Sequence, residues 1–321
     1  MGKGNLGLRA SFFKICLRQF AMKKICVTGG NGLLGSKLLT AACRKYRLVS
    51  IDLQESPLFQ CDDLEYVQGD ITDRDVIISQ IVQFHPDCVI HTAAFTNVDG
   101  CEKEKDKAWK VNVSGAENVA LACRDLKIKM IHISTDYVFD GKNGPYSETD
   151  RPNPISFYGK TKLESEKRIR ETVEDSVIAR TMVLYGYFPG VRMNFVTWLI
   201  NKLRSSEKVN IVTDQYGTPT LADDLARALI ILFEKEAQGL YNAAGSELIN
   251  RYDFALRIAE IFDLDSSLIE KATSDHLKQP APRPLQSGLL VDKICSEMGV
   301  HFSSVREGLL IMKKQMELKL N

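Results

Sequence analysis

A tyrosine and a lysine stand four positions apart in Tyr158-Gly-Lys-Thr-Lys162, downstream of a glycine-rich stretch at 29–35. On a helix, residues at this spacing lie on one face. A free tyrosine has a pKa of about 10 and is a poor acid at neutral pH. A neighbouring ammonium favours the phenolate and should lower that pKa. The pair is therefore suited to exchange a proton with a sugar or alcohol oxygen, although the same spacing also fits an ordinary solvated helix face.

Two hydroxyl side chains precede this pair, because Ser134 and Thr135 end the apolar segment that begins at Met130. If that segment is a strand of a doubly wound sheet, its carboxyl end is where ligands lie. A hydroxyl there can bond the same substrate oxygen that Tyr158 faces. The alternative is that both hydroxyls only cap the turn. Because Tyr158 and Lys162 are also present, we favour a catalytic role for this strand end.

The glycine-rich stretch GGNGLLG (29–35) contains the G-x-G-x-x-G spacing of a dinucleotide-binding turn. It follows a short apolar segment at 24–28 and opens a helical pattern at 33–46, which is the context that gives the motif meaning. Glycines permit the tight turn and the close approach of a pyrophosphate, and the helix start supplies free N–H groups. We predict a dinucleotide site here.

Asp52 ends the next predicted strand, at 48–52. A carboxylate at this position accepts hydrogen bonds from an adenosine ribose and repels a 2′-phosphate. Asp52 therefore favours NAD(H) over NADP(H) as the cofactor, while its alternative role is that of a solvated strand end.

Short apolar segments alternate with helical patterns through the first part of the chain. The predicted strands are 24–28, 48–52, 64–68, 87–91, 130–134 and 177–181, and the predicted helices between them include 33–46, 73–84 and 104–126. This alternation indicates an α/β fold with a doubly wound parallel (Rossmann) sheet. A Gly-, Pro- and Asn-rich loop at 140–154 precedes the helix of Tyr158, as expected for a loop that covers a substrate.

Beyond Thr181 the pattern loosens, with predicted helices at 193–204, 222–235 and 251–262, a strand near 240–242 and a proline-rich turn at 280–284. We expect a smaller C-terminal substrate lobe that is interleaved with the sheet. The dinucleotide-binding domain would comprise 22–181 plus about 214–247, and the lobe about 182–213 and 248–321.

Residues 1–21 carry four basic side chains, no acid and several scattered apolar ones. This composition lacks the uninterrupted apolar core and the cleavage site of a secretory signal. We interpret the segment as a disordered or non-native extension, with a helix that contacts a partner or a membrane surface as the alternative.

The composition of the 321 residues, 44% hydrophobic and 26% charged, is that of an ordinary globular protein. Forty-two basic and 41 acidic residues give a net charge of +1, which argues against nucleic acid as a partner. No run of 18 apolar residues predicts a membrane span. The eight cysteines form no C-x-x-C pair, so we expect reduced thiols in a cytoplasmic protein and no metal site.

With these sites on one chain, the sequence resembles the extended short-chain dehydrogenase/reductases. Longer strings are similar to dTDP-4-dehydrorhamnose reductases, and the resemblance covers about residues 22–290. The strings are HTAAFTNVDGCE (91–102), ISTDYVFDG (133–141), YGKTKLESE (158–166), ARTMVLYG (179–186), MNFV (193–196) and DQYGTPT (214–220).

The resemblance implies a role for each matching position on the cofactor side. Five residues would cradle the pyrophosphate of NAD(H) or NADP(H): Gly29, Asn31, Gly32, Leu33 and Leu34. The other cofactor contacts would be Asp52 with the ribose, Asp70 and Ile71 with the adenine, and Ala93 and Ala94 beside the nicotinamide.

On the substrate side, the resemblance implies a catalytic triad of Thr135, Tyr158 and Lys162, in which Lys162 also holds the nicotinamide ribose. Tyr158 would protonate the C4 oxygen of a nucleotide-linked 4-keto-6-deoxysugar as C4 accepts hydride. Asn194 and Arg283 would face this substrate, since a guanidinium matches a diphosphate. The alternatives are a helix cap for Asn194 and a surface charge on a loop for Arg283. A homodimer is left open.

One departure leaves the sugar open. The bacterial rhamnose enzymes carry Ser-Trp after an Arg-Thr pair, whereas here Arg180-Thr181 is followed by Met182 and Val183, so Val183 would stand beside the sugar. Two other functions also stay open. The regulatory beta subunit of methionine adenosyltransferase resembles the same family without being a catalyst, and fold alone does not decide function. An epimerase or dehydratase is less favoured, because Asp136 is followed by Tyr137 rather than by a glutamate.

Overall fold

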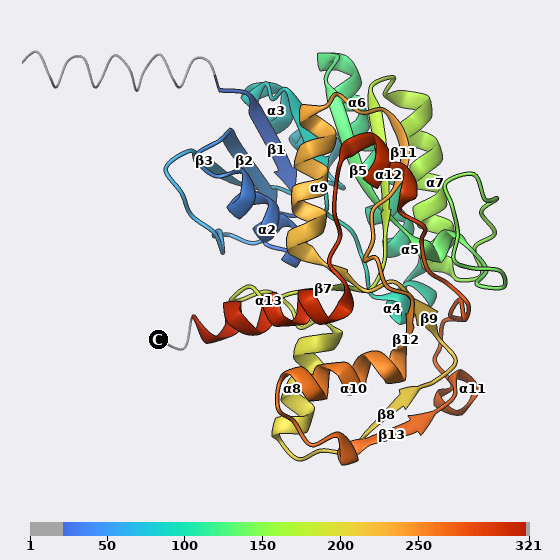
Figure 1. Cartoon of the computed structure of the whole chain (residues 1–321). Helices are drawn as coiled ribbons and strands as arrows, with labels where there is room; N and C mark the ends of the chain where they lie inside the picture. The colour runs from blue at the N-terminus through green and yellow to red at the C-terminus, as the bar shows by residue number, and fades with distance from the viewer. Residues whose placement is uncertain (1–21, 319–321) are drawn as a thin grey trace, which may run out of the picture.

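Seven parallel strands form the central sheet of the chain, of which the computed structural model describes residues 22–318 (Figure 1). The expectations for residues 1–21 lie outside the described residues. Across the sheet the order is β11 (Gly239–Asn242), β6 (Ser176–Thr181), β5 (Lys129–Thr135), β4 (Cys88–His91), β1 (Lys24–Thr28), β2 (Arg47–Asp52) and β3 (Leu64–Gln68). From β1 the chain adds β2 and β3 on one side and then β4, β5 and β6 on the other, so the predicted doubly wound sheet is confirmed.

Helices cover both faces of the sheet because the strand side chains alternate between two apolar cores. Ile25 and Val27 of β1 enter one core, and Cys26 enters the other. The first core is closed by α2 (Leu33–Ala42), α9 (Ala222–Glu234) and α12 (Asp292–Met298). The second is closed by α3 (Arg74–Phe84), α6 (Ala116–Leu126) and α7 (Phe157–Thr172), the helix of Tyr158.

The helix predicted at 104–126 is wrong in its middle. The structure has α4 (Val98–Lys103), α5 (Lys105–Trp109) and a π-helical turn, η1 (Lys110–Gly115), before α6 begins. The wide turn places Asn112, whose amide bonds both backbone groups of Phe95 and the hydroxyl of Thr161 on α7. A periodic sequence cannot reveal such a turn, because the tertiary hydrogen bonds of Asn112 stabilise it.

A smaller lobe lies below the carboxyl edge of the sheet in Figure 1. Its helices and strands are β7 (Leu184–Tyr185), α8 (Phe195–Arg204), β8 (Val209–Val212), β9 (Tyr216–Gly217), β10 (Thr220–Leu221), β12 (Ile249–Asn250), α10 (Arg251–Ile261), η3 (Ser266–Leu268), β13 (Ile269–Ala272) and α11 (Ser274–Leu277). The chain returns to the sheet for α9 and β11 between β10 and β12, so the lobe is interleaved. The exact domain boundaries stay a prediction.

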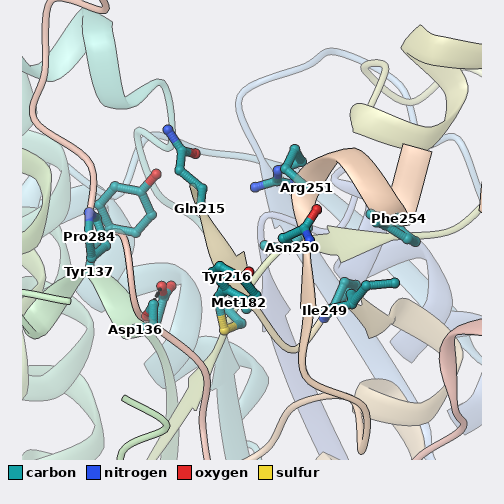
Figure 2. Close-up of a pocket in the computed structure, with 14 residues that line it drawn as sticks. Asp136, Tyr137, Met182, Gln215, Tyr216, Ile249, Asn250, Arg251, Phe254 and Pro284 are labelled. Carbon is teal, nitrogen blue, oxygen red and sulfur yellow. Dashed lines mark hydrogen bonds between the residues drawn. The ribbon is translucent and has the colours of Figure 1, made fainter. Parts of the chain in front are cut away.

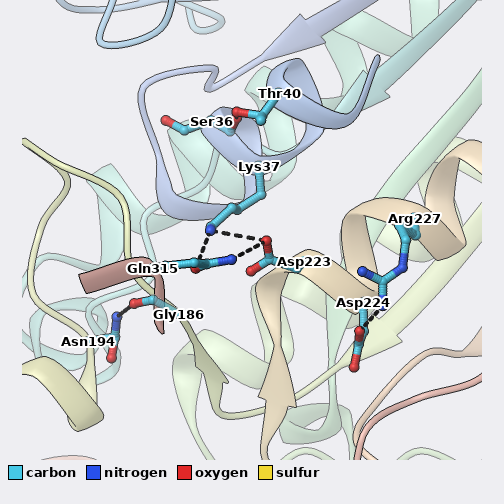
Figure 3. A network of polar contacts seen from close by, with 9 residues as sticks. All are labelled: Ser36, Lys37, Thr40, Gly186, Asn194, Asp223, Asp224, Arg227 and Gln315. Atoms are coloured by element: carbon cyan, nitrogen blue, oxygen red, sulfur yellow. Dashed lines mark hydrogen bonds and ion pairs between the residues drawn. The ribbon is translucent and has the colours of Figure 1, made fainter. Parts of the chain in front are cut away.

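The C-terminal helix α13 (Val305–Glu317), which the sequence analysis did not predict, joins the lobe to the sheet layer. Its inner face enters the apolar core of the lobe beside α8 and α10. Its outer part is tied to α2 and α9, where Lys37 bonds both Asp223 at 3.1 Å and Gln315 at 2.7 Å (Figure 3). A capping box between Ser304 and Glu307 begins the helix.

The described cysteines are free thiols. Cys26, Cys88 and Cys123 are buried, and burial raises the pKa of each thiol. Within residues 22–318, no helix combines the length and the apolar character that crossing a bilayer requires.

Two neighbouring leucines of α13 test how this helix holds the lobe. Leu309 is fully buried in the lobe core, whereas Leu310 is 46% exposed. Leu309→Ala should lower the free energy of unfolding by about 2–5 kcal/mol through lost burial and the cavity left behind. The control Leu310→Ala should stay within about 0.5 kcal/mol of the wild type. Urea unfolding followed by circular dichroism measures both, and equal effects would contradict the packing of α13.

Candidate functional site

The glycine turn between β1 and α2 leaves no room for side chains at several positions. Gly29 has a φ of +76°, and a Cβ there would lie 2.7 Å from the backbone nitrogen of Ala93. A Cβ at Gly35 would lie 2.2 Å from the carbonyl oxygen of Gly29. Gly32 is the N-cap of α2, and no side chain caps this helix start. A turn of this shape fits a pyrophosphate, which accepts hydrogen bonds from free N–H groups at a helix start.

Asp52 and Asn31 meet beside this turn. The backbone N–H of Asn31 donates to Asp52 Oδ2 at 3.0 Å. The amide of Asn31 donates to the carbonyl of Ser56 and to the hydroxyl of Tyr66, and its oxygen accepts from the backbone of Leu58. The side chain of Asn31 therefore holds the loop after β2, and only its backbone belongs to the glycine turn.

The remaining predicted cofactor residues border the same edge of the sheet. Ala93 and Ala94 are half-buried directly after β4, with Ala93 against Gly29. Leu33 and Leu34 begin α2. Asp70 accepts from the backbone of Thr72, and the buried Ile71 is held by Asn118, whose amide donates to its carbonyl.

Tyr158 lies at the start of α7 and faces the end of β5. Its ring meets the ring of Tyr137 edge-on with 5.6 Å between centroids. Burial raises the pKa of Tyr158 well above its ordinary value, the charge of Asp136 adds to this, and a hydrogen bond with Thr135 opposes it. The predicted lowering of this pKa is therefore wrong for the structure, because desolvation of the phenol dominates.

Lys162 points from α7 into a buried polar chain. Its Nζ lies 3.0 Å from His132 Nε2, and the ring of His132 stacks on that of His91. His91 Nδ1 in turn lies 2.6 Å from the hydroxyl of Thr28. Burial lowers the pKa of His91 to about 3 and that of His132 well below its usual value, so both rings are neutral. Burial also lowers the pKa of Lys162 to about 8, against the charge of Glu166.

The sequence analysis missed both histidines. The signal was a polar ring in each of two predicted apolar strands, at the end of one and in the middle of the other. His91 of β4 pairs with His132 of β5 in the sheet register. Next to them, Glu166 of α7 makes a bidentate ion pair with Arg180 of β6, and Ser134 donates to the same carboxylate. Ser134 is thus part of the support of α7, while Thr135 is the hydroxyl beside Tyr158.

A pocket adjoins Tyr137 and opens between the sheet edge and the lobe (Figure 2). Its lining comes from segments far apart in the chain: Asp136, Tyr137, Met182, Val183, Gln215, Tyr216, Gly217, Pro219, Ile249, Asn250, Arg251, Phe254, Pro284 and Ser287. Asp136 accepts from Ser287 at 2.8 Å and from Thr135 at 3.1 Å. Burial raises the pKa of Asp136 to about 6, although these hydrogen bonds oppose the shift.

The three predicted substrate residues lie in different settings. Val183 lines the pocket, with a φ of +43° that is rare for a β-branched residue. Asn194 caps α8, and its amide donates to Gly186 at 2.7 Å (Figure 3), so its side chain is already used by the fold. Arg283 pairs with Asp99 at 2.9 Å, next to Pro284 of the pocket lining. The sequence analysis missed Arg251.

Within the described residues 22–318, no group of three or more His, Cys, Asp or Glu side chains is arranged to hold a metal ion.

Comparison with known proteins identifies relatives over nearly the whole described chain. The family model "RmlD substrate binding domain" matches residues 22–318. A probable low-salt glycan biosynthesis reductase, Agl14 of Haloferax volcanii, is 34% identical, with 89% of this chain and 96% of that protein covered. The dTDP-4-dehydrorhamnose reductase of Aggregatibacter actinomycetemcomitans is 32% identical over 90% of this chain and 97% of that protein.

Two further relatives bear on the cofactor and on catalysis. The crystal structure of dTDP-4-dehydrorhamnose reductase from Bacillus anthracis in complex with NADP has a TM-score of 0.83 and 28% identity, covering 92% of this chain and 99% of that one. Methionine adenosyltransferase 2 subunit beta of Bos taurus is 32% identical over 78% of this chain and 75% of that protein.

The buried carboxyl of Asp136 should give the protein a specific pH dependence. Its folded pKa of about 6 exceeds the ordinary value of 3.8. Between these values the folded state binds the proton more tightly, so this group's contribution to stability is lost as pH rises through the window. The free energy of unfolding of Asp136→Asn minus that of the wild type should therefore increase by about 1–3 kcal/mol when the pH is raised from 4 to 7. Urea unfolding at both pH values measures this, and a difference that does not change with pH would contradict it.

Proposed function

The chain belongs to the RmlD substrate binding domain family, and from that membership we propose that it is an NAD(P)H-dependent reductase of a nucleotide-linked 4-keto-6-deoxysugar. The observation that carries the proposal is the burial of Tyr158 and Lys162 on one face of α7, beside the pocket-lining Tyr137 and at the same sheet edge as the glycine turn. The names of the relatives, a glycan biosynthesis reductase and dTDP-4-dehydrorhamnose reductases, support this substrate class.

The glycine turn fits a nicotinamide dinucleotide, because Gly29 and Gly35 permit a tight turn that side chains would prevent, and the start of α2 has no side-chain cap. The turn would hold the pyrophosphate, Asp52 the adenosine ribose, and Ala93 with Ala94 would lie beside the nicotinamide. When bound, NAD(P)H would supply the hydride that reduces the ketone.

The chain's own residues would handle the proton. The raised pKa of Tyr158 keeps its phenol protonated at neutral pH, so the side chain is ready to donate. Thr135 would orient the sugar oxygen toward that phenol, and the ammonium of Lys162 would stabilise the negative charge left on it. Burial of Tyr158 and Lys162 keeps water from competing for the proton.

The lining of the pocket supports a deoxysugar. Met182 and Val183 present apolar surface at the end of β6, which suits a methyl group at C6, as in dTDP-L-rhamnose biosynthesis or the synthesis of a related deoxysugar. Asp136 and Gln215 supply polar groups for sugar hydroxyls.

A non-catalytic role is the second candidate, favoured by the 32% identity with a methionine adenosyltransferase beta subunit. In that case the chain would bind a dinucleotide and serve as a partner of another protein. The Thr135, Tyr158 and Lys162 set does not separate the two functions, so turnover decides between them.

Turnover tests the reductase directly. Purified protein should oxidise NADH or NADPH with at least one of a panel of nucleotide-linked 4-keto-6-deoxysugars, followed at 340 nm. Tyr158→Phe should lower kcat by about 10²–10⁴-fold through loss of the proton donor, with cofactor binding unchanged by fluorescence titration. Tyr137→Phe, whose ring touches that of Tyr158, is the matched control and should keep most of kcat.

Two outcomes would count against this proposal. A fully active Tyr158→Phe protein would remove the assigned acid. No oxidation with any sugar of the panel would favour the binding-subunit alternative.

Asp52 predicts the choice of cofactor. The loop 53–63 that follows it contains Glu55, Asp62 and Asp63 and no basic residue to meet a 2′-phosphate. We therefore expect a lower KM for NADH than for NADPH. Asp52→Asn keeps an acceptor for the N–H of Asn31 but removes the charge, so it should narrow the difference between the two KM values. An unchanged ratio would show that Asp52 does not select the cofactor.

A further inference from the structure

Arg251 is the first residue of α10 and lines the pocket on the side opposite Asp136 and Tyr137 (Figure 2). The backbone fixes this position from both ends. Its own N–H donates to the carbonyl of Gln215, and Asn250 caps the helix by accepting from Asp253. The guanidinium is therefore presented to the pocket by a rigid helix start.

Within the described residues 22–318, the guanidinium of Arg251 makes no ion pair and no side-chain hydrogen bond. It lies over the ring of Phe195, at 4.7 Å from the centroid, and the carboxyl of Asp136 attracts it electrostatically across the pocket. The two other arginines near the site differ, because Arg180 is paired with Glu166 and Arg283 with Asp99. A half-buried cation without an ion pair is unfavourable, and burial lowers the pKa of Arg251 accordingly.

A second cation is close by. Arg251 and Arg283 repel each other electrostatically, and both charges act on the hydroxyl of Tyr137. We name these two residues the arginine pair. Because Asp99 pairs with Arg283, Arg251 is the member of the pair without an ion-pair partner. A planar guanidinium binds phosphate oxygens through two parallel hydrogen bonds, and a group with two negative charges would relieve the repulsion within the pair.

We propose that Arg251 binds the diphosphate of the nucleotide-sugar substrate, together with Arg283. The inference rests on the proposed function. It adds the residue that would bind the nucleoside diphosphate part of that substrate. The position agrees with the chemistry of such a substrate. The ring of Tyr137 contacts that of Tyr158, and its hydroxyl is affected by the charges of the arginine pair. A diphosphate bound to the pair would therefore be separated from the Tyr158 hydroxyl by the side chain of Tyr137. In a nucleotide sugar the diphosphate is attached at C1, across the ring from C4.

The proposal separates binding from chemistry. Arg251 contacts neither Tyr158 nor Thr135 through any hydrogen bond or ion pair of the described residues. Its loss should therefore raise Kd and KM and leave kcat near that of the wild type.

Calorimetric titration of the full chain with dTDP and UDP tests this, with thymidine and uridine as phosphate-free probes. Arg251→Gln should raise the Kd of the better diphosphate by about 10- to 100-fold, the loss expected for charge-assisted hydrogen bonds, and should leave nucleoside binding unchanged. Arg251→Lys keeps the charge without the planar fork and should fall between. Arg257→Gln is the matched control on the exposed side of α10, where Arg257 pairs with Glu260, and should bind as the wild type.

Several results would overturn the assignment. The first is a wild type that binds neither dTDP nor UDP, and the second is an Arg251→Gln protein with an unchanged Kd. The third is an Arg251→Gln protein that loses affinity for UDP-glucuronate but not for UDP-glucose, which would assign the guanidinium to a sugar carboxylate. NADH binding and the melting temperature verify folding of each variant, and Arg251→Lys decides if Arg251→Gln does not fold. A wild type that binds dTDP or UDP but reduces no 4-ketosugar would refute the proposed function and leave this inference standing.

Discussion

Two buried polar contacts fix helix α7 to the sheet, and the geometry of the site depends on them. Lys162 meets His132 of β5, and one helical turn later Glu166 forms a bidentate pair with Arg180 of β6. Buried charges are tolerated only when they are well paired, so α7 has one favourable position against the two strands. That position brings Tyr158, at the start of the same helix, to the end of β5.

The pocket beside Tyr158 is built by the return of the chain to the sheet. After β6 the chain enters the lobe, returns to the sheet layer for α9 and β11, and enters the lobe again before α10. Each crossing contributes lining residues, such as Val183, Gln215 and Arg251. Helix α13 holds the lobe in place, because its inner face is buried with α8 and α10 while Gln315 and Lys37 connect it to the sheet layer.

The burial of its phenol, rather than the charge of Lys162, sets the pKa of Tyr158. Spacing alone suggests that the ammonium of Lys162 acts on the phenol, but the ammonium is directed to His132, and burial of the phenol dominates. A protonated tyrosine suits a proton donor in a reduction better than a phenolate would. The sequence motif was likewise overruled at Asn194, because the groups that would bind a substrate are used to cap α8 and to bond Gly186.

The sequence by itself determined the features that short-range chemistry encodes: the glycine turn before a helix, the alternation of strands and helices, and the Tyr158–Lys162 spacing. These could be predicted because each depends on neighbours within a few residues. Tertiary structure alone decided the π-helical turn at Asn112, the stacked histidines behind Lys162 and the exposure of Arg251 to a pocket opposite Asp136. Such features depend on groups from distant segments meeting at the sheet edge, and no local pattern records which distant side chain will be the neighbour.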